Sequence, residues 1–247
     1  RHHLINNKSI KEKYSIGDYL KDFSNISNKI FKKKDLIFLC GGSGLYIEAA
    51  CKGLNEIPKI KDGIRNELHK EFQKNGIDKL TEKLKKYDFQ SWKNIDLKNP
   101  RKVIRCLEVY LSTKKPISLY LNNPLKKKEF NTLYFFLNEK REILYEKINT
   151  RVENMISRGL KKEAKDLIEL NEDFLLNTIG YKEFYNFFNK KQSLEETISL
   201  IKRNTRRYAK RQITWFKSKN YIEINPNKIE KIENIINKKR EANASLL

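Results

Sequence analysis

A run of small residues, Gly41-Gly42-Ser43-Gly44, is the segment of this sequence best suited to approach a ligand closely. Glycines let the backbone come near a bound group, and the amides at the start of a following helix attract anions. The run is not a P-loop, because Gly-x-x-x-x-Gly-Lys-Ser/Thr occurs nowhere in the chain, and Ile47 replaces the third glycine of a dinucleotide fingerprint. The local pattern favours a ligand loop and a structural tight turn about equally.

Residues 202–219 are the second candidate, with eight Lys/Arg and no acidic residue in eighteen positions. Large side chains recur at three- and four-residue steps, so one helix face can pack while the other presents cations to a phosphate backbone. The alternative is a solvated basic face, but the interleaved aromatic rings favour RNA contact. The packing stripe is Ile198, Ile201, Thr205, Tyr208, Gln212 and Trp215, the cations off it are Arg203, Arg206, Arg207, Lys210 and Lys217, and the rings available for stacking are Tyr208, Trp215 and Phe216.

Two shorter segments place cations at a helix start. Pro100 opens a helix in which Arg101, Lys102 and Arg105 follow at i, i+1 and i+4. The segment Ile179-Gly180-Tyr181-Lys182 places a glycine, an aromatic ring and a cation before another helix. Taken alone, the first pattern is more often solvent-exposed charge, and the second is more often a turn.

The sequence offers no metal or nucleophile constellation. The adjacent His2 and His3 point apart and have no third ligand nearby. Cys40, Cys51 and Cys106 are odd in number and widely spaced, which fits neither a disulfide framework nor a zinc site. We therefore expect no metal site from these residues and a reducing, cytoplasmic setting.

The charge balance points to a polyanionic partner. The 247 residues carry 53 Lys+Arg against 31 Asp+Glu, a formal charge of +22, which favours nucleic acid ahead of an anionic membrane surface. Part of this charge follows from a Lys-, Asn- and Ile-rich composition rather than from binding. The apolar runs fall far short of the roughly 20 residues of a membrane helix, and 38% hydrophobic residues suffice for a core.

The elements that must position these residues alternate between strands and helices. The order strand Asp35–Cys40, glycine run, helix Leu45–Lys52 is a unit of α/β folds. Further strands are expected at Asn131–Leu137 and Asn220–Ile224, with an all-helical block between the first two. The other predicted helices are Ser15–Lys32, Gly63–Asn75, Ile77–Tyr87, Pro100–Ser112, Ile117–Leu121, Glu139–Ser157, Leu160–Leu170, Tyr181–Asn189, Ser193–Lys217 and Asn227–Lys239.

Taken together, the motifs resemble the tRNA dimethylallyltransferases, also called tRNA isopentenyl transferases. They occur in family order and spacing across nearly the whole chain, which makes the set far more specific than any single motif. The segments are Arg1–Ile5, Tyr14–Tyr19, Gly41–Tyr46, Gly53-Leu54 through Pro58 and Arg65, Asn99–Val109, Arg151-Val152 with Met155 and Gly159-Leu160, Ile179–Lys182, and Thr205–Phe216.

The resemblance implies a nucleotide-binding, P-loop-kinase-like α/β core, residues 1–60 and 130–247, with an all-helical insertion, residues 61–129, that binds the tRNA anticodon stem-loop. It implies transfer of a dimethylallyl group from dimethylallyl diphosphate to the exocyclic amine of an adenosine beside the anticodon, with Mg²⁺. The amine lone pair is delocalised into the ring, so a base must take its proton and cations must neutralise the departing diphosphate. The target base must also leave its stack.

The resemblance also assigns roles to residues of this chain. Arg151 is expected against the diphosphate, and Ser43, which stands where the family has threonine, is expected on the adenosine. Lys182 replaces an arginine, so a forked contact becomes a point charge. The residues expected on tRNA from the helical insertion are Arg65, Arg101, Lys102 and Arg105, and those expected near the target base are Gly180, Tyr181, Lys182 and the segment 210–217, which begins with Lys210, Arg211 and Gln212.

One family feature is missing from this sequence. Members begin with a strand, a phosphate loop ending in Gly-Lys-Thr/Ser and an aspartate base, all before the segment that matches Arg1–Ile5. We therefore expect an N-terminal portion carrying these groups and the Mg²⁺ ligands, an inactive chain without it, and a cytoplasmic monomer that does not bind membranes. The alternatives are a non-catalytic RNA-binding remnant and, more weakly, a small-molecule kinase relative.

Overall fold

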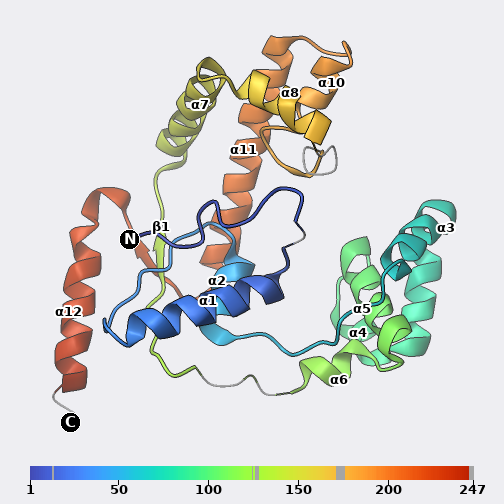
Figure 1. Ribbon diagram of the computed structural model, residues 1–247, viewed down its shortest axis with the longest axis horizontal. Helices are drawn as coiled ribbons and strands as arrows, with labels where there is room; N and C mark the ends of the chain where they lie inside the picture. The colour runs from blue at the N-terminus through green and yellow to red at the C-terminus, as the bar shows by residue number, and fades with distance from the viewer. Residues whose placement is uncertain (13, 124, 126–127, 171–175, 245–247) are drawn as a thin grey trace. The chain divides into compact units, whose positions relative to one another are not determined.

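The computed structural model describes residues 1–247 except 13, 124, 126–127, 171–175 and 245–247 (Figure 1). The chain divides into two compact units, one made of Arg1–Cys51 with Phe130–Leu247 and the other of Lys52–Glu129. In the described part of the chain, no helix is long and apolar enough to cross a membrane.

The unit Lys52–Glu129 is built from helices. Its helices are α3 (Ile64–Tyr87), α4 (Phe89–Asn94), α5 (Pro100–Thr113) and α6 (Ile117–Leu121). Gly76, at φ +75°, kinks α3, which agrees with the prediction of two successive helices there. Asn99 caps α5 by accepting from the Arg101 amide, and Pro100 occupies its first turn.

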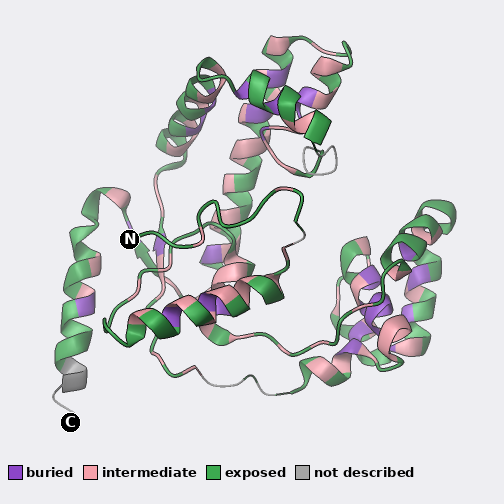
Figure 2. Ribbon diagram, in the orientation of Figure 1, coloured by how far each residue is buried: buried purple, intermediate pink, exposed green. Residues whose placement is uncertain are grey.

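The core of this unit lies between α3 and α5. Leu80 and Leu84 of α3 and Val103 and Leu107 of α5 are fully buried and belong to one apolar cluster. Figure 2 shows buried positions on both helices. Burying a Val or Leu side chain contributes about 1.5–3 kcal/mol, so this cluster accounts for much of the stability of the unit.

Helix α4 was not predicted from the sequence. Asp88 begins it by accepting from the Ser91 amide at 2.9 Å and the Ser91 hydroxyl at 2.8 Å, and it also accepts from the Ser118 amide of α6 at 3.1 Å. Burial raises the pKa of Asp88, but these hydrogen bonds outweigh burial and hold the pKa below its usual value. The Asp-x-x-Ser pattern was the available signal.

The other unit contains α1 (Ile16–Phe31), α2 (Gly44–Lys52), α7 (Arg141–Ser157), α8 (Leu160–Leu170), α10 (Phe184–Phe188), α11 (Leu194–Lys217) and α12 (Glu230–Ala244). The predicted capping boxes are present at both α1 and α11. Ser15 pairs with Asp18, and Ser193 pairs with Glu196. A short 3-10 turn, Pro226–Lys228, precedes α12, and α10 is shorter than the helix predicted over Tyr181–Asn189.

Helices α7, α8, α10 and α11 share an apolar core. The cluster contains Val152 of α7, Leu160 and Ala164 of α8, Phe184 of α10 and Ile201 of α11. Lys202 of α11 also pairs with an acidic residue of α7, so charged contacts at the edge reinforce the apolar packing. This core fixes α7 against α11, the two helices that carry most of the predicted cations of the unit.

The sheet of this unit has two parallel strands among the described residues. Strand β1 (Phe135–Leu137) pairs with β2 (Ile222–Ile224), with Phe136 opposite Glu223. Both strands lie within predicted segments but are shorter than predicted. The structure is therefore mixed α/β, rich in helix and with a small sheet.

The predicted strand Asp35–Cys40 is wrong. The segment belongs to no strand or helix, and Leu36 and Phe38 are 39% and 67% exposed. A strand exists only where a neighbouring backbone accepts and donates its hydrogen bonds, and no described strand pairs with this segment. An apolar run by itself does not show whether a neighbouring strand is present to pair with it.

Candidate functional site

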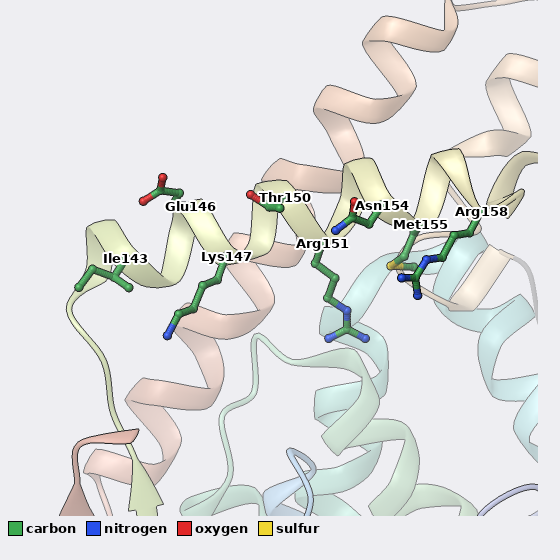
Figure 3. Close-up of a pocket in the computed structure, with 8 residues that line it drawn as sticks. All are labelled: Ile143, Glu146, Lys147, Thr150, Arg151, Asn154, Met155 and Arg158. Carbon is green, nitrogen blue, oxygen red and sulfur yellow. The ribbon is translucent and has the colours of Figure 1, made fainter. Parts of the chain in front are cut away.

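A groove runs along one face of α7 (Figure 3). Its volume is about 590 Å³. Figure 3 shows Lys147 and Arg151 extending to the same side of α7, whereas Glu146 points to the other side. Residues four apart on a helix share a face, which explains why these two cations lie together. The groove is lined by Ile143, Glu146, Lys147, Thr150, Arg151, Asn154, Met155 and Arg158.

Arg151 is exposed in this groove and forms no hydrogen bond or ion pair with any residue that the structure describes. Its neighbour Lys147, in contrast, pairs with Glu139 at 3.3 Å. A guanidinium carries five donors in a rigid fork that matches phosphate oxygens. Arg158, which also lines the groove, likewise has no side-chain partner among the described residues. The groove therefore presents two guanidinium groups that no described residue neutralises, and these can bind an anion.

Polar contacts fix the opposite side of α7 on α11. Lys202 donates to Glu153 at 2.5 Å, and Arg206 donates to Asn149 at 2.7 Å. Arg206, one of the cations predicted to face RNA, therefore binds within the protein instead. Arg203, Arg207, Lys210, Arg211 and Lys217 of the same helix are exposed.

The predicted cationic face of α11 is therefore present in part. Arg211 lies over the ring of Tyr208, with 5.6 Å from its guanidinium carbon to the ring centroid. Tyr208 is itself exposed rather than part of the packed stripe. The exposed cations and this ring form a surface that can bind a polyanion and stack on a base.

The glycine run, residues 41–44, packs against α11. The amide of Gln212 donates to the carbonyl of Gly42 at 2.8 Å. A Cβ on Gly44 would lie 2.3 Å from the ring of Trp215, which explains why glycine is required there. Ser43 is exposed, and its hydroxyl has no hydrogen-bond partner among the described residues.

The turn Gly180-Tyr181-Lys182 is held by two carboxylates. The amide of Gly180, at φ +96°, donates to Glu183 at 2.8 Å, and the hydroxyl of Tyr181 donates to Glu163 at 3.0 Å. Burial, followed by the hydrogen bond to Glu163, raises the pKa of Tyr181. Glu183 also accepts from Asn204 of α11 at 2.7 Å, and Lys182 is exposed. Sequence reasoning missed Glu183, although it directly follows the quoted motif.

In the unit Lys52–Glu129, two of the predicted arginines meet on one buried carboxylate. Arg65 donates two bonds to Glu108, at 2.8 and 2.9 Å, and Arg105 donates a third at 2.5 Å. Burial raises the pKa of Glu108, but the two guanidinium groups outweigh burial and hold it below its usual value. Arg101 and Lys102 are exposed at the start of α5 and do not join this cluster.

Glu108 was not among the predicted site residues. It lies inside the quoted segment Asn99–Val109, three residues after Arg105, on the face of α5 that carries the buried apolar residues. An acidic residue on an apolar helix face was the signal that could have identified it. Within the described residues, no group of three or more His, Cys, Asp or Glu side chains could hold a metal ion.

The fold and this site define a basic, helix-rich α/β protein with an unneutralised arginine in an open groove. A family model described as IPP transferase matches residues 1–219. The tRNA dimethylallyltransferase of Christiangramia forsetii is 43% identical over 216 residues, which are 87% of this chain and 72% of that protein. The tRNA dimethylallyltransferase of Flavobacterium psychrophilum is 40% identical over 222 residues, with the same shares of the two chains.

Solved structures give the same result. The full-length tRNA isopentenylpyrophosphate transferase of Bacillus halodurans superimposes with a TM-score of 0.66 and 34% identity, over 99% of this chain and 80% of that one. A eukaryotic dimethylallyltransferase acting on tRNA superimposes with a TM-score of 0.71 and 26% identity, over 87% and 55%. The chain belongs to the IPP transferase family, and its curated relatives carry the name of a prenyltransferase enzyme.

Proposed function

We propose that this chain forms most of a tRNA dimethylallyltransferase. The enzyme transfers a dimethylallyl group from dimethylallyl diphosphate to the exocyclic amine of an adenosine beside the tRNA anticodon. The observation that carries the proposal is the exposed guanidinium of Arg151, which lies in the α7 groove of a family member without a neutralising partner in the described chain. A departing diphosphate is the kind of anion that such a group stabilises.

The roles of the individual residues follow from the charges that the reaction develops. Arg151 contacts the diphosphate and stabilises the negative charge that accumulates as the allylic C–O bond breaks. The adenosine leaves its stack to reach the allylic carbon, and the exposed hydroxyl of Ser43 contacts it there. Because delocalisation makes the amine a weak nucleophile, a general base must also remove its proton.

The tRNA is held by basic residues of both units. Arg65, Arg101, Lys102 and Arg105 bind the anticodon stem-loop from the unit Lys52–Glu129. Gly180, Tyr181 and Lys182, together with Lys210, Arg211 and the rest of 210–217, bind near the target base. Phosphate contacts release counterions, so binding weakens as the salt concentration rises.

The general base, the phosphate loop and the Mg²⁺ ligands belong in this proposal to further N-terminal residues, which complete a P-loop-kinase-like core. The apolar segment Leu36–Cys40 supports this, because its backbone pairs with no described strand and Phe38 is exposed. The described residues do not fit a Mg²⁺ site, since no acidic cluster of sufficient size is present.

The experiment compares two proteins, the 247-residue chain and a longer protein that also contains the residues encoded upstream of Arg1. Each is incubated with tRNA, Mg²⁺ and radiolabelled dimethylallyl diphosphate, and label in tRNA is measured. We expect label in tRNA only with the longer protein. In the cell we expect this protein to act as a monomer in the cytoplasm. Salt-dependent binding of an anticodon stem-loop with no transfer by either protein would instead identify an RNA-binding remnant. Nucleoside triphosphate binding without RNA binding would identify a kinase relative.

A further inference from the structure

Three side chains at the end of α11 and just after it contact the glycine run and α2. Gln212 and Trp215 are three residues apart on α11, a spacing that places their side chains on one helix face, and Lys219 follows the end of the helix. They contact Gly42, Gly44 and Glu48 respectively. Two segments that lie 170 residues apart in the sequence are thus aligned residue by residue.

The first contact is polar and close. The Gln212 side-chain amide donates to the Gly42 carbonyl at 2.8 Å, and a Cβ on Gly42 would lie only 2.1 Å from the same nitrogen. The amide of Gln212 therefore lies directly on the loop backbone. Any side chain at position 42 would displace it.

The second and third contacts extend the alignment into α2. Three ring atoms of Trp215 lie 2.3–2.5 Å from the position of a Cβ on Gly44, so the ring occupies the space that only glycine leaves open. Lys219 then pairs with Glu48 at 3.0 Å, and its ammonium lies 5.0 Å from the ring centroid of Trp215. The ring is thus packed between the loop and a cation.

The residue between the two close contacts is Ser43. Its carbonyl accepts from the amides of Tyr46 and Ile47 at 3.0 and 3.2 Å, so its backbone is fixed at the start of α2. Its hydroxyl faces solvent without a partner among the described residues. The loop is therefore rigid on both sides of an available polar group.

We propose that Gln212 and Trp215 are positioning residues that act through Ser43. They hold the Ser43 hydroxyl at a fixed distance from the exposed cations Lys210 and Arg211, which stand within two turns of them on the same helix. The group that contacts the target adenosine and the groups that bind phosphate then move as one body. This inference rests on the proposed function and replaces the direct tRNA contact expected for Gln212.

The physical benefit is preorganisation. A misplacement of 1 Å in a reacting group can cost about a hundredfold in rate, whereas loss of one phosphate contact mainly weakens binding. We therefore expect removal of the Gln212 contact to lower kcat for transfer. Loss of a phosphate cation on the same helix should instead raise KM for tRNA.

The test uses the longer, active protein and the variant Gln212→Leu, which keeps side-chain bulk and removes the donor. We expect kcat to fall about tenfold, the effect of one lost hydrogen bond, with KM for tRNA little changed. The matched comparison is Lys210→Ala, two residues earlier on α11, which should raise KM and reduce the salt dependence of binding. Melting temperatures of both variants are measured to detect misfolding.

A double-mutant cycle with Ser43→Ala separates positioning from direct contact. If Gln212 acts through Ser43, Gln212→Leu should cost little further kcat in the Ser43→Ala background. Additive losses, or a loss confined to KM and relieved at low salt, would overturn the inference while leaving the proposed function intact. An inactive wild-type protein would instead reject the proposed function.

A second variant keeps the test decisive if Gln212→Leu fails to fold. Gly42→Ala places a Cβ where the Gln212 amide lies, so it should lower kcat. Adding Gln212→Ala makes room for this Cβ but also removes the hydrogen bond, so kcat should recover no further than the level of Gln212→Ala alone. Hydrogen exchange of residues 41–48 offers a readout independent of activity. Faster exchange in Gly42→Ala is expected, and unchanged exchange with unchanged kcat would contradict a positioning role for Gln212.

Discussion

The arginines on α3 and α5 differ from the arginine of α7 in what holds them. Arg65 and Arg105 are bound to the buried carboxylate of Glu108 by three hydrogen bonds of 2.5–2.9 Å. Arg151 extends into an open groove without a partner in the described chain. The two settings give the same residue type different tasks.

The comparison distinguishes a rigid cationic surface from an anion-binding position. Glu108 neutralises one of the two charges beside it and holds Arg65 by two bonds and Arg105 by one, so both arginines keep further donors close to a fixed position. Arg151 keeps its full charge and all of its donors for a ligand. We therefore expect substitutions near Glu108 to affect stability and tRNA binding, and substitution of Arg151 to affect the chemical step.

The largest effect is expected for Arg151→Ala in the active, longer protein. Removing one preorganised donor from a developing anion typically costs about 10²–10³ in kcat. Single-turnover transfer of labelled dimethylallyl groups to tRNA measures the loss. Arg141→Ala on the same helix is the control, because Arg141 lies over Tyr145 and does not line the groove. Unchanged turnover in Arg151→Ala would remove Arg151 from the mechanism.

The next effect concerns Glu108→Ala, which removes the carboxylate that holds both arginines. Breaking a fully buried pair costs about 3–5 kcal/mol, but Arg65 and Arg105 are partly exposed and can regain water, so we expect about 2 kcal/mol. Urea unfolding measures the free energy of unfolding. Glu71→Ala, which breaks a surface pair with Lys83, is the matched control and should cost less than about 1 kcal/mol. Equal losses in the two variants would show that Glu108 has no special role.

Local signals made much of this fold predictable. The capping boxes at Ser15 and Ser193, the glycine at position 76 and Pro100 act within a few residues, and each marks the helix boundary or kink that the structure contains. The strand Asp35–Cys40 was not predictable in the same way, because a strand depends on a partner elsewhere in the chain. The prediction rested on the apolar residues of the segment, which do not show whether another strand pairs with it.

The site was predictable in its residue types and less so in its contacts. Motif order identified Arg65 and Arg105, but their shared partner Glu108 lies 43 residues from Arg65 and became visible only in the packed structure. The Gln212–Gly42 contact spans 170 residues and changes the expected role of Gln212 in the same way. Residue spacing along a helix predicts which side chains share a face, whereas contacts between distant segments depend on tertiary packing.

The pH dependence of stability tests the lowered pKa of Glu108. Its pKa is lower in the folded chain than in the unfolded chain, so the folded state binds fewer protons, and this stabilisation is fully present above the ordinary glutamate pKa of about 4.3. It is lost as the pH falls through the folded pKa. We expect the wild-type protein to lose more stability between pH 5 and pH 3 than Glu108→Gln, each measured by urea unfolding. Parallel losses would contradict a depressed pKa at Glu108.

Binding to an anticodon stem-loop tests whether a held arginine still contacts phosphate. In Arg105→Ala, the slope of log affinity against log salt should decrease in magnitude by somewhat less than one phosphate contact, because Glu108 already neutralises part of the charge. In Arg101→Ala, which alters an exposed residue of the same helix, the decrease should approach one full contact. Equal slopes for the two variants would mean that Glu108 does not modulate Arg105.

The smallest effect is expected for Lys182→Arg, which extends the comparison to a third cation. Lys182 lies on the turn held by Glu183 and Glu163, so its position is fixed by carboxylates, as the positions of Arg65 and Arg105 are. Its side chain is exposed, so its charge is available to a ligand, as the charge of Arg151 is. A guanidinium can form two parallel bonds where an ammonium acts as a point charge, so we expect KM for tRNA to fall about two- to threefold. Lys191→Arg, at an exposed position outside the turn, is the control and should leave KM unchanged. A KM that falls equally in both variants would trace the gain to general arginine–RNA attraction and would remove Lys182 from the specific contacts.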